Sequence, residues 1–177
     1  MIVHLRLRRR IKNLLYKVEE FHVEKIYNDQ CFITFTRFIR KYPKAVLMLM
    51  VEDEGWTELQ KNYAERRYKQ LTSNFPNVVG LHVHLTGLHG QPLLPLPKRE
   101  EQHRKISYGL KFLNKIGLNS HVFASGRWST NNDTLEVCKY LGLTEVHVKK
   151  EHLSCSRIPE GITLKYVRNF MHDYACY

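Results

Sequence analysis

The sequence predicts an α/β domain with a mostly parallel sheet, and three observations support this fold class. Short apolar runs alternate with longer stretches of helical periodicity, a pattern typical of βαβ units. Several runs are almost wholly apolar, such as that from Val46 to Val51, as expected for strands covered on both faces. The length of 177 residues is typical of one domain, so a single domain over residues 1–177 is expected.

Six strands and four helices are expected between residues 20 and 167. The strands are the short apolar runs, and the helices are the longer stretches between them. The helix over 99–116 has the clearest pattern, because Ile106, Leu110 and Leu113 share one face and Gly117 follows as a C-terminal cap. The expected elements, in order, are strand 20–26, helix 32–40, strand 45–51, helix 57–73, strand 78–85, helix 99–116, strand 120–123, helix 133–140, strand 145–148 and strand 163–167.

The other helices are predicted from their apolar faces and their ends. In the helix over 32–40, Phe32, Phe35 and Phe38 lie on one side, and Pro43 ends it. The helix over 57–73 has a broad apolar face, and the helix over 133–140 follows a polar stretch and ends before Gly142. Residues 1–18 are expected to form a peripheral basic helix, packed against the domain or, alternatively, lying on anionic lipid.

The chain is strongly basic, with a formal net charge of +11 and a pI near 9.6. Such a charge attracts polyanions, so nucleic acid is a possible partner. The sequence shows no fold motif or aromatic platform of a nucleic-acid-binding module, and a generally basic surface is favoured instead. These patterns leave the oligomeric state open.

The cysteines are scattered and form no CxxC pair, which argues against a structural zinc ribbon or a disulfide-rich secreted fold. No signal-peptide pattern follows the basic start, and no window approaches the roughly 18 apolar residues of a membrane span. A cytoplasmic location without a transmembrane segment is therefore predicted. The cysteines are Cys31, Cys138, Cys155 and Cys176.

The most informative segment is GLHVHL at 80–85. Because side chains alternate along a strand, His82 and His84 are expected on the same side. Two imidazoles on one face can give two nitrogen ligands to a metal ion, and His89, in the long loop over 86–97, could supply a third. The alternative is a pair of hydrogen-bonded histidines in a polar barrel interior.

Further motifs follow this segment in a fixed order: Pro95 with REEQ at 99–102, GLKFLNKIG at 109–117, FASGRWS at 123–129, NDTL at 132–135 and LG at 141–142. Together with GLHVHL they resemble the central half of the polysaccharide deacetylases, and most of all the short archaeal and bacterial branch of that family. The resemblance covers about residues 45–142. It implies a distorted or incomplete (β/α) barrel, with the site at the C-terminal ends of the strands.

The resemblance also implies a hydrolase that removes an acetyl group from an amino sugar or glycan. A divalent metal, with zinc as the expected ion, would assist this reaction. The histidine motif of the family falls on His82 and His84, as metal ligands. The catalytic base would be Glu24, and the arginine that orients it would be Arg127.

The late histidine motif of the family falls on His172, which would protonate the leaving amine, and Asp173 would hold its imidazole in place. The alternative for both residues is an ordinary C-terminal tail. Trp128 would line the sugar site as a flat stacking surface, and its alternative is a core tryptophan.

The sequence departs from the family at the first motif, where the resemblance implies two adjacent aspartates and Glu24-Lys25 stands instead. Asp29 is a candidate substitute carboxylate, and Lys25 is a candidate cation in place of the metal. The departure leaves two alternatives to the hydrolase. One is a catalytically silent protein of the deacetylase fold that binds carbohydrate or a protein, and the other is a basic nucleic-acid-binding protein.

Overall fold

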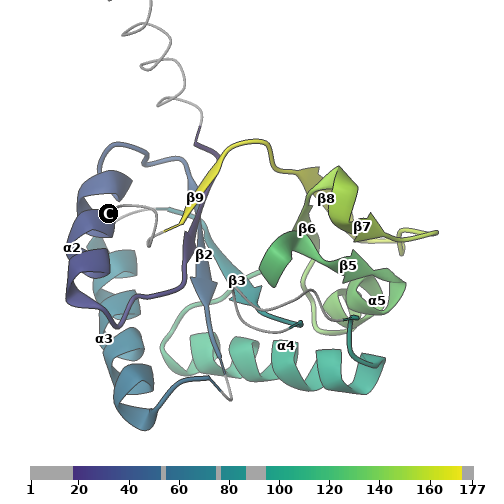
Figure 1. Cartoon of the computed structure of the whole chain (residues 1–177), viewed down its shortest axis with the longest axis horizontal. Helices are drawn as coiled ribbons and strands as arrows, with labels where there is room; N and C mark the ends of the chain where they lie inside the picture. The colour runs from purple at the N-terminus through teal and green to yellow at the C-terminus, as the bar shows by residue number, and fades with distance from the viewer. Residues whose placement is uncertain (1–17, 53–54, 75–76, 87–94, 173–177) are drawn as a thin grey trace, which may run out of the picture.

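The computed structural model describes residues 18–52, 55–74, 77–86 and 95–172. Its main strands are β1 (Glu20–Val23), β2 (Val46–Met50), β3 (Val79–Val83), β4 (Val122–Ser125), β6 (Glu145–Val148), β8 (Thr163–Tyr166) and β9 (Phe170–His172). They form one parallel sheet in the order β8-β6-β4-β3-β2-β1-β9. The sheet curls into a half-barrel (Figure 1), so the α/β class and the incomplete barrel are both confirmed.

The helices lie around the outside of the curled sheet (Figure 1). Alternation along the strands gives them one apolar face to pack on, with Phe21 and Leu47 in the main core. Gly109 allows the helix over Arg99–Lys115 to approach β3 closely, because a Cβ atom there would lie 2.7 Å from Leu81 Cδ1. The helices are α2 (Asp29–Ile39), α3 (Glu58–Asn74), α4 (Arg99–Lys115) and α5 (Asn132–Tyr140).

The inner face of the curled sheet differs from the outer face. A small apolar cluster that includes Met48 and Trp128 fills part of it. The remainder carries charged and imidazole side chains, among them Glu20, His22 and His82, all of them buried. The interior of the barrel is therefore the polar part of this molecule.

A short connection joins the two edge strands of the sheet. After β8, the Val167 N–H donates to Val148 O at 3.1 Å, and two residues later Asn169 O accepts from the Glu19 N–H at 2.9 Å. The chain thus passes from β8, beside β6, to β9, beside β1, within three residues, and Figure 1 shows this segment in yellow. Its continuation, β9, pairs with β1 so that His172 lies beside His22.

Two predictions differ from the structure in an informative way. Residues 170–172 form β9, although the sequence analysis predicted no strand there. Helix α2 begins at Asp29 rather than at Phe32, because the Asn28 side chain accepts a hydrogen bond from the Cys31 N–H at 3.1 Å and caps the helix. The Asn28 cap is a local signal in the sequence, but the prediction followed the spacing of the phenylalanines and placed the start of the helix too late.

The predicted helix over 1–18 lies outside the described residues except for its last position, as does most of the loop over 86–97. In the part of the chain that the structure describes, no helix has the length and apolar character needed to cross a membrane.

Candidate metal centre

The candidate centre lies where β1, β3 and β9 end. Glu24 directly follows β1, His82 belongs to β3, His84 directly follows it, and His172 closes β9. The carboxyl ends of parallel strands meet at one end of a barrel, which is where these side chains gather. The sites of (β/α) barrels are found at the same end.

One oxygen of Glu24 stands at the middle of this group. Glu24 Oε1 lies 3.4 Å from His82 Nε2 and 3.6 Å from His84 Nε2. The two Nε2 atoms are 3.2 Å apart. His172 Nδ1 lies 3.0 Å from the same oxygen, and all four side chains are buried or half-buried.

The hydrogen bonds of His82 determine which of its nitrogens carries the proton. His82 Nδ1 lies 3.0 Å from the carbonyl oxygen of Ala124. A carbonyl only accepts, so Nδ1 is the donor and Nε2 keeps its lone pair. That lone pair faces Glu24 Oε1 and His84 Nε2, which are also electron-rich atoms. Such a cluster needs either a shared proton or a cation between its members.

A search of the described residues for side chains close enough to share a metal ion identifies His22, Glu24 and His82. Their candidate ligand atoms lie within 4.8 Å of one another, and the three side chains are buried. A buried group of this chain could therefore hold a metal ion. His22 Nε2, however, is hydrogen-bonded to Glu20 Oε1.

The protonation states of the group suit a metal ion. Burial raises the pKa of Glu24, but the close imidazoles of His172, His82 and His84 outweigh this effect and hold it well below its usual range. Burial and the neighbouring His22 together lower the pKa of His82 to about 3. An ionised carboxylate and a neutral imidazole are the forms that bind metals, so Glu24 and His82 are in the states that a cation requires.

A second carboxylate lies behind His84. Glu52 follows β2 and is buried, and its Oε1 lies 4.0 Å from His84 Nδ1. Among the described residues, neither of these two buried atoms has a hydrogen-bond partner. Burial raises the pKa of Glu52, and the proximity of His84 acts in the opposite direction.

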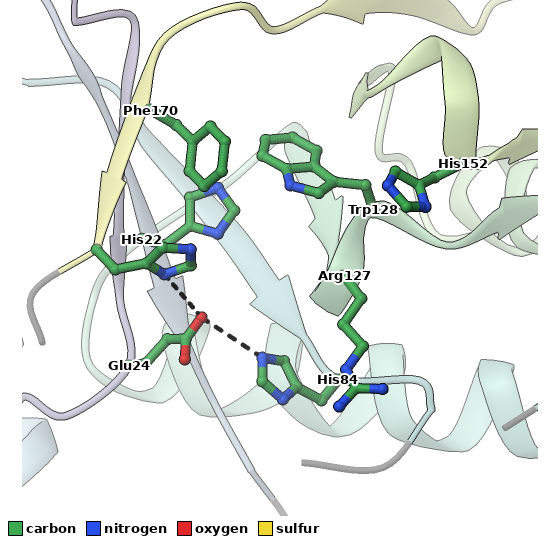
Figure 2. A pocket seen from close by; sticks show the side chains of 8 residues that line it. His22, Glu24, His84, Arg127, Trp128, His152 and Phe170 are labelled. Atoms are coloured by element: carbon green, nitrogen blue, oxygen red, sulfur yellow. Dashed lines mark ion pairs between the residues drawn. The ribbon is translucent and has the colours of Figure 1, made fainter. Parts of the chain in front are cut away.

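A cavity of about 400 Å³ opens beside the centre. Trp128 and Phe170 form an aromatic wall, with ring centroids 5.1 Å apart and planes at 73° (Figure 2). The Lys149 ammonium lies 4.4 Å from the centroid of Phe170. The lining residues are His22, Glu24, His84, Arg127, Trp128, His152, Phe170 and His172.

The turn after β4 brings two of the lining residues to the cavity at the cost of backbone strain. It is a 3₁₀ turn, η1 (Gly126–Trp128), in which Arg127 has a φ of 57° and Trp128 a φ of 62°. Side-chain-bearing residues rarely adopt such angles, and strained residues of this kind cluster at functional sites. Gly126 is required here, because a Cβ atom would lie 2.1 Å from His84 Cδ2.

Another polar group lies deeper in the barrel. The fully buried Glu20 accepts hydrogen bonds from His22 Nε2 and His147 Nδ1, and His147 Nε2 lies 2.6 Å from Glu145 Oε1. Strands β1 and β6 are separated by three other strands in the sheet, so this chain of hydrogen bonds crosses the barrel interior. The last group of this chain is the Lys165 ammonium, whose Nζ lies 3.9 Å from Glu145 Oε1.

Most of the predicted site residues are found together. His84, Glu24, Arg127, Trp128 and His172 line the cavity, and His82 lies beside it in contact with Glu24. His89 and Asp173 are outside the described residues. His172 belongs to a strand, not to a tail.

Two other suggestions were wrong. The Asp29 carboxylate is 84% exposed and pairs with Arg67, so it is not a substitute ligand. Lys25 is exposed while its neighbour Glu24 is buried, because successive side chains point to opposite sides, so Lys25 does not occupy the place of a metal.

The sequence analysis missed His22, Glu52, His152 and Phe170. The alternation rule that paired His82 with His84 also pairs His22 with Glu24, and this local signal could have identified His22. His152 and Phe170 had no local signal, because only the path of the chain around the barrel brings them to the cavity.

No protein-family model matches this chain, and a search of curated proteins found no match. The chemistry of the centre is therefore inferred from its own residues.

Proposed function

We propose that this chain is a metal-dependent hydrolase that removes an acetyl group from an amino sugar or glycan. The observation that supports it most is the triangle formed by Glu24 Oε1, His82 Nε2 and His84 Nε2, with sides of 3.4, 3.6 and 3.2 Å. In tetrahedral zinc sites with bonds of about 2.0–2.1 Å, ligand atoms are separated by about 3.3 Å. The triangle has the size that a zinc ion requires.

The donor set also fits. Two histidines and one carboxylate are a common ligand set of catalytic zinc sites, which keep a further position open. We assign His84 rather than His22 as the third ligand, because His84 Nε2 lies 3.6 Å from Glu24 Oε1 and 3.2 Å from His82 Nε2. Glu24, expected as the base, is assigned as a ligand because its Oε1 contacts both imidazoles. A divalent cation held here would supply Lewis-acid activation of the acyl carbonyl.

The other residues of the cavity would carry the proton and hold the sugar. His172 is the group placed to accept the proton of the attacking water at its imidazole and to return it to the leaving nitrogen when the C–N bond breaks. Water thus adds to the acyl carbon, and acetate and a free amine are released. Trp128 and Phe170 offer flat apolar faces on which a sugar ring can stack.

Metal content and acetate release test this proposal together. We expect purified protein to bind Zn²⁺ or Co²⁺ at one site per chain, and to release acetate from N-acetylated oligosaccharides in its presence. The variants His82→Gln and His84→Gln should each lose most of the metal, because two protein ligands make a weak site. The exposed His121→Gln variant is the matched control.

Two outcomes would contradict the proposal in different ways. Protein that binds neither ion would exclude the metal centre. Tight metal binding without acetate release would exclude the hydrolase and favour the carbohydrate-binding alternative. The variant His22→Gln tests the ligand assignment, since it should retain the metal where His84→Gln does not.

A further inference from the structure

Glu52 is the side chain that directly faces His84 from the neighbouring strand. The register of β2 and β3 pairs Met50 with His82. The pairing continues beyond the C-terminal end of β2, where the Val51 N–H donates to His82 O at 3.1 Å. Two residues further on, Glu52 and His84 stand opposite each other. The Glu52 carboxylate also accepts a hydrogen bond from the backbone of His84, so the two residues are already held together.

The same pair contains two of the unsatisfied buried atoms of the described chain. Glu52 Oε1 and His84 Nδ1 are 4.0 Å apart, too far for a hydrogen bond, and neither has another partner among the described residues. Buried polar atoms without partners are costly and rare in native proteins, so the pair calls for an explanation.

A change of tautomer at His84 accounts for both atoms. While Nε2 of His84 carries the proton, it can donate a hydrogen bond towards Glu24 or His82. Nδ1 then carries no proton, so it cannot donate a hydrogen bond to Glu52. When Nε2 binds a cation, the proton must be on Nδ1, where it faces the carboxyl oxygen Oε1 of Glu52. A shift of about 1 Å then makes a normal hydrogen bond.

We infer that Glu52 is a positioning residue of the metal centre, which accepts a hydrogen bond from His84 Nδ1 and so directs Nε2 of the same ring towards Glu24 and His82. This inference rests on the proposed function, since it requires that His84 binds a metal ion. Histidine ligands in metal sites usually donate their second N–H to a carboxylate or a carbonyl. The Ala124 carbonyl is the acceptor for Nδ1 of His82, and Glu52 would be the acceptor for Nδ1 of His84.

The variant Glu52→Leu separates positioning from a structural role, because the two predict changes of opposite sign. If Glu52 positions His84, the dissociation constant for Co²⁺ or Zn²⁺ rises about 10- to 100-fold. The melting temperature of the metal-free protein stays equal or rises, because a buried carboxyl group with one unpaired oxygen has been removed. A structural role would instead lower that melting temperature.

The conservative variant Glu52→Gln should recover much of the lost affinity, since an amide oxygen still accepts from Nδ1–H. Proton NMR of the Co²⁺ form should show the exchangeable Nδ1 proton of His84 in the wild type, and show it weakened or absent in Glu52→Leu. Glu100→Gln, which removes an exposed carboxylate of α4, is the control for loss of charge.

The outcomes separate this inference from the proposed function. Equal metal affinity in the wild type and in Glu52→Leu would overturn the inference and leave the metal centre intact. Joint loss of affinity and of metal-free stability would overturn it in favour of a structural role. A wild type that binds neither ion would overturn the metal centre, and this inference with it.

Discussion

A single carboxylate stays ionised inside this barrel because three imidazoles surround it. Without them, burial would raise the pKa of Glu24 and favour its neutral form, whereas the proximity of His172, His82 and His84 lowers it. At the same time burial keeps His82 neutral. The residues thus hold one another in the charge states that bind a cation, and each depends on the others.

His172 provides the first test at this scale. Its Nδ1 contacts Glu24 Oε1 at 3.0 Å, yet it is not one of the three proposed ligands. We expect His172→Gln to reduce acetate release about 100-fold or more, as is typical for loss of a general acid–base group. Its Co²⁺ affinity should stay close to that of the wild type. Unchanged rates of acetate release would exclude this role.

At the scale of elements, the strained turn η1 links strand packing to the centre. Gly126 lies against His84, and Arg127 and Trp128 reach the cavity from the same turn. The shape of this turn therefore affects both the third ligand and the aromatic wall.

The variant Gly126→Ala should reveal this link. The added methyl would overlap the His84 ring, so we expect a loss of about 1–3 kcal/mol in unfolding free energy together with weaker Co²⁺ binding. Gly109→Ala crowds Leu81 in the outer core instead, so it should lower stability alone. Denaturant unfolding and Co²⁺ titration of both variants measure the difference. Equal metal affinities in the two variants would contradict the expectation.

Strands β1 and β6 are tied across the barrel by Glu20 and His147. Burial raises the pKa of Glu20, but the hydrogen bonds from His147 and His22 lower it to about 2 from an ordinary value of 4.5. Since the folded-state pKa is lowered, the ionised group stabilises the fold above pH 4.5, and this contribution is lost as the pH falls towards 2. The shift corresponds to about 3 kcal/mol at neutral pH.

We therefore expect Glu20→Gln to lower the unfolding free energy at pH 7 by about 3 kcal/mol. The difference from the wild type should shrink as the pH is lowered from 4.5 towards 2. Urea unfolding over a pH series measures it, with the exposed Glu160→Gln variant as the control. A difference that stays constant down to the lowest pH at which both proteins fold would refute this account.

At the scale of the whole molecule, the net charge of +11 is not explained by the centre. A generally basic surface predicts weak binding to any polyanion. A nucleic-acid-binding function predicts specific binding that persists at physiological salt. Salt dependence distinguishes the two.

We expect affinity for duplex DNA to fall at least about 10-fold between 50 and 200 mM salt, without sequence preference. Replacing Arg8, Arg9 and Arg10 together by glutamine should weaken binding only in part, because basic residues occur throughout the chain. Fluorescence anisotropy with labelled duplexes measures both effects. Sequence-specific binding at physiological salt that the triple variant abolishes would favour the nucleic-acid alternative.

Local patterns were sufficient to predict most of the fold. Strand β6 has the expected bounds, and β2, β3 and α4 lie within one or two residues of theirs, because apolar periodicity and capping residues act over a few positions. Strand β9 could not be predicted in this way, since its three residues form a strand only by pairing with β1, about 150 residues earlier in the chain.

The sequence by itself determined that His82 and His84 share one face, because side chains alternate along any strand. It also indicated Glu24, Arg127, Trp128 and His172 as candidates through the order of the motifs. Only the tertiary structure decided that a Glu24 oxygen lies within 3.6 Å of both imidazoles, and that Glu52 stands behind one of them. Those distances depend on how the sheet curls and on which strands become neighbours, and both are set by packing between residues far apart in the chain.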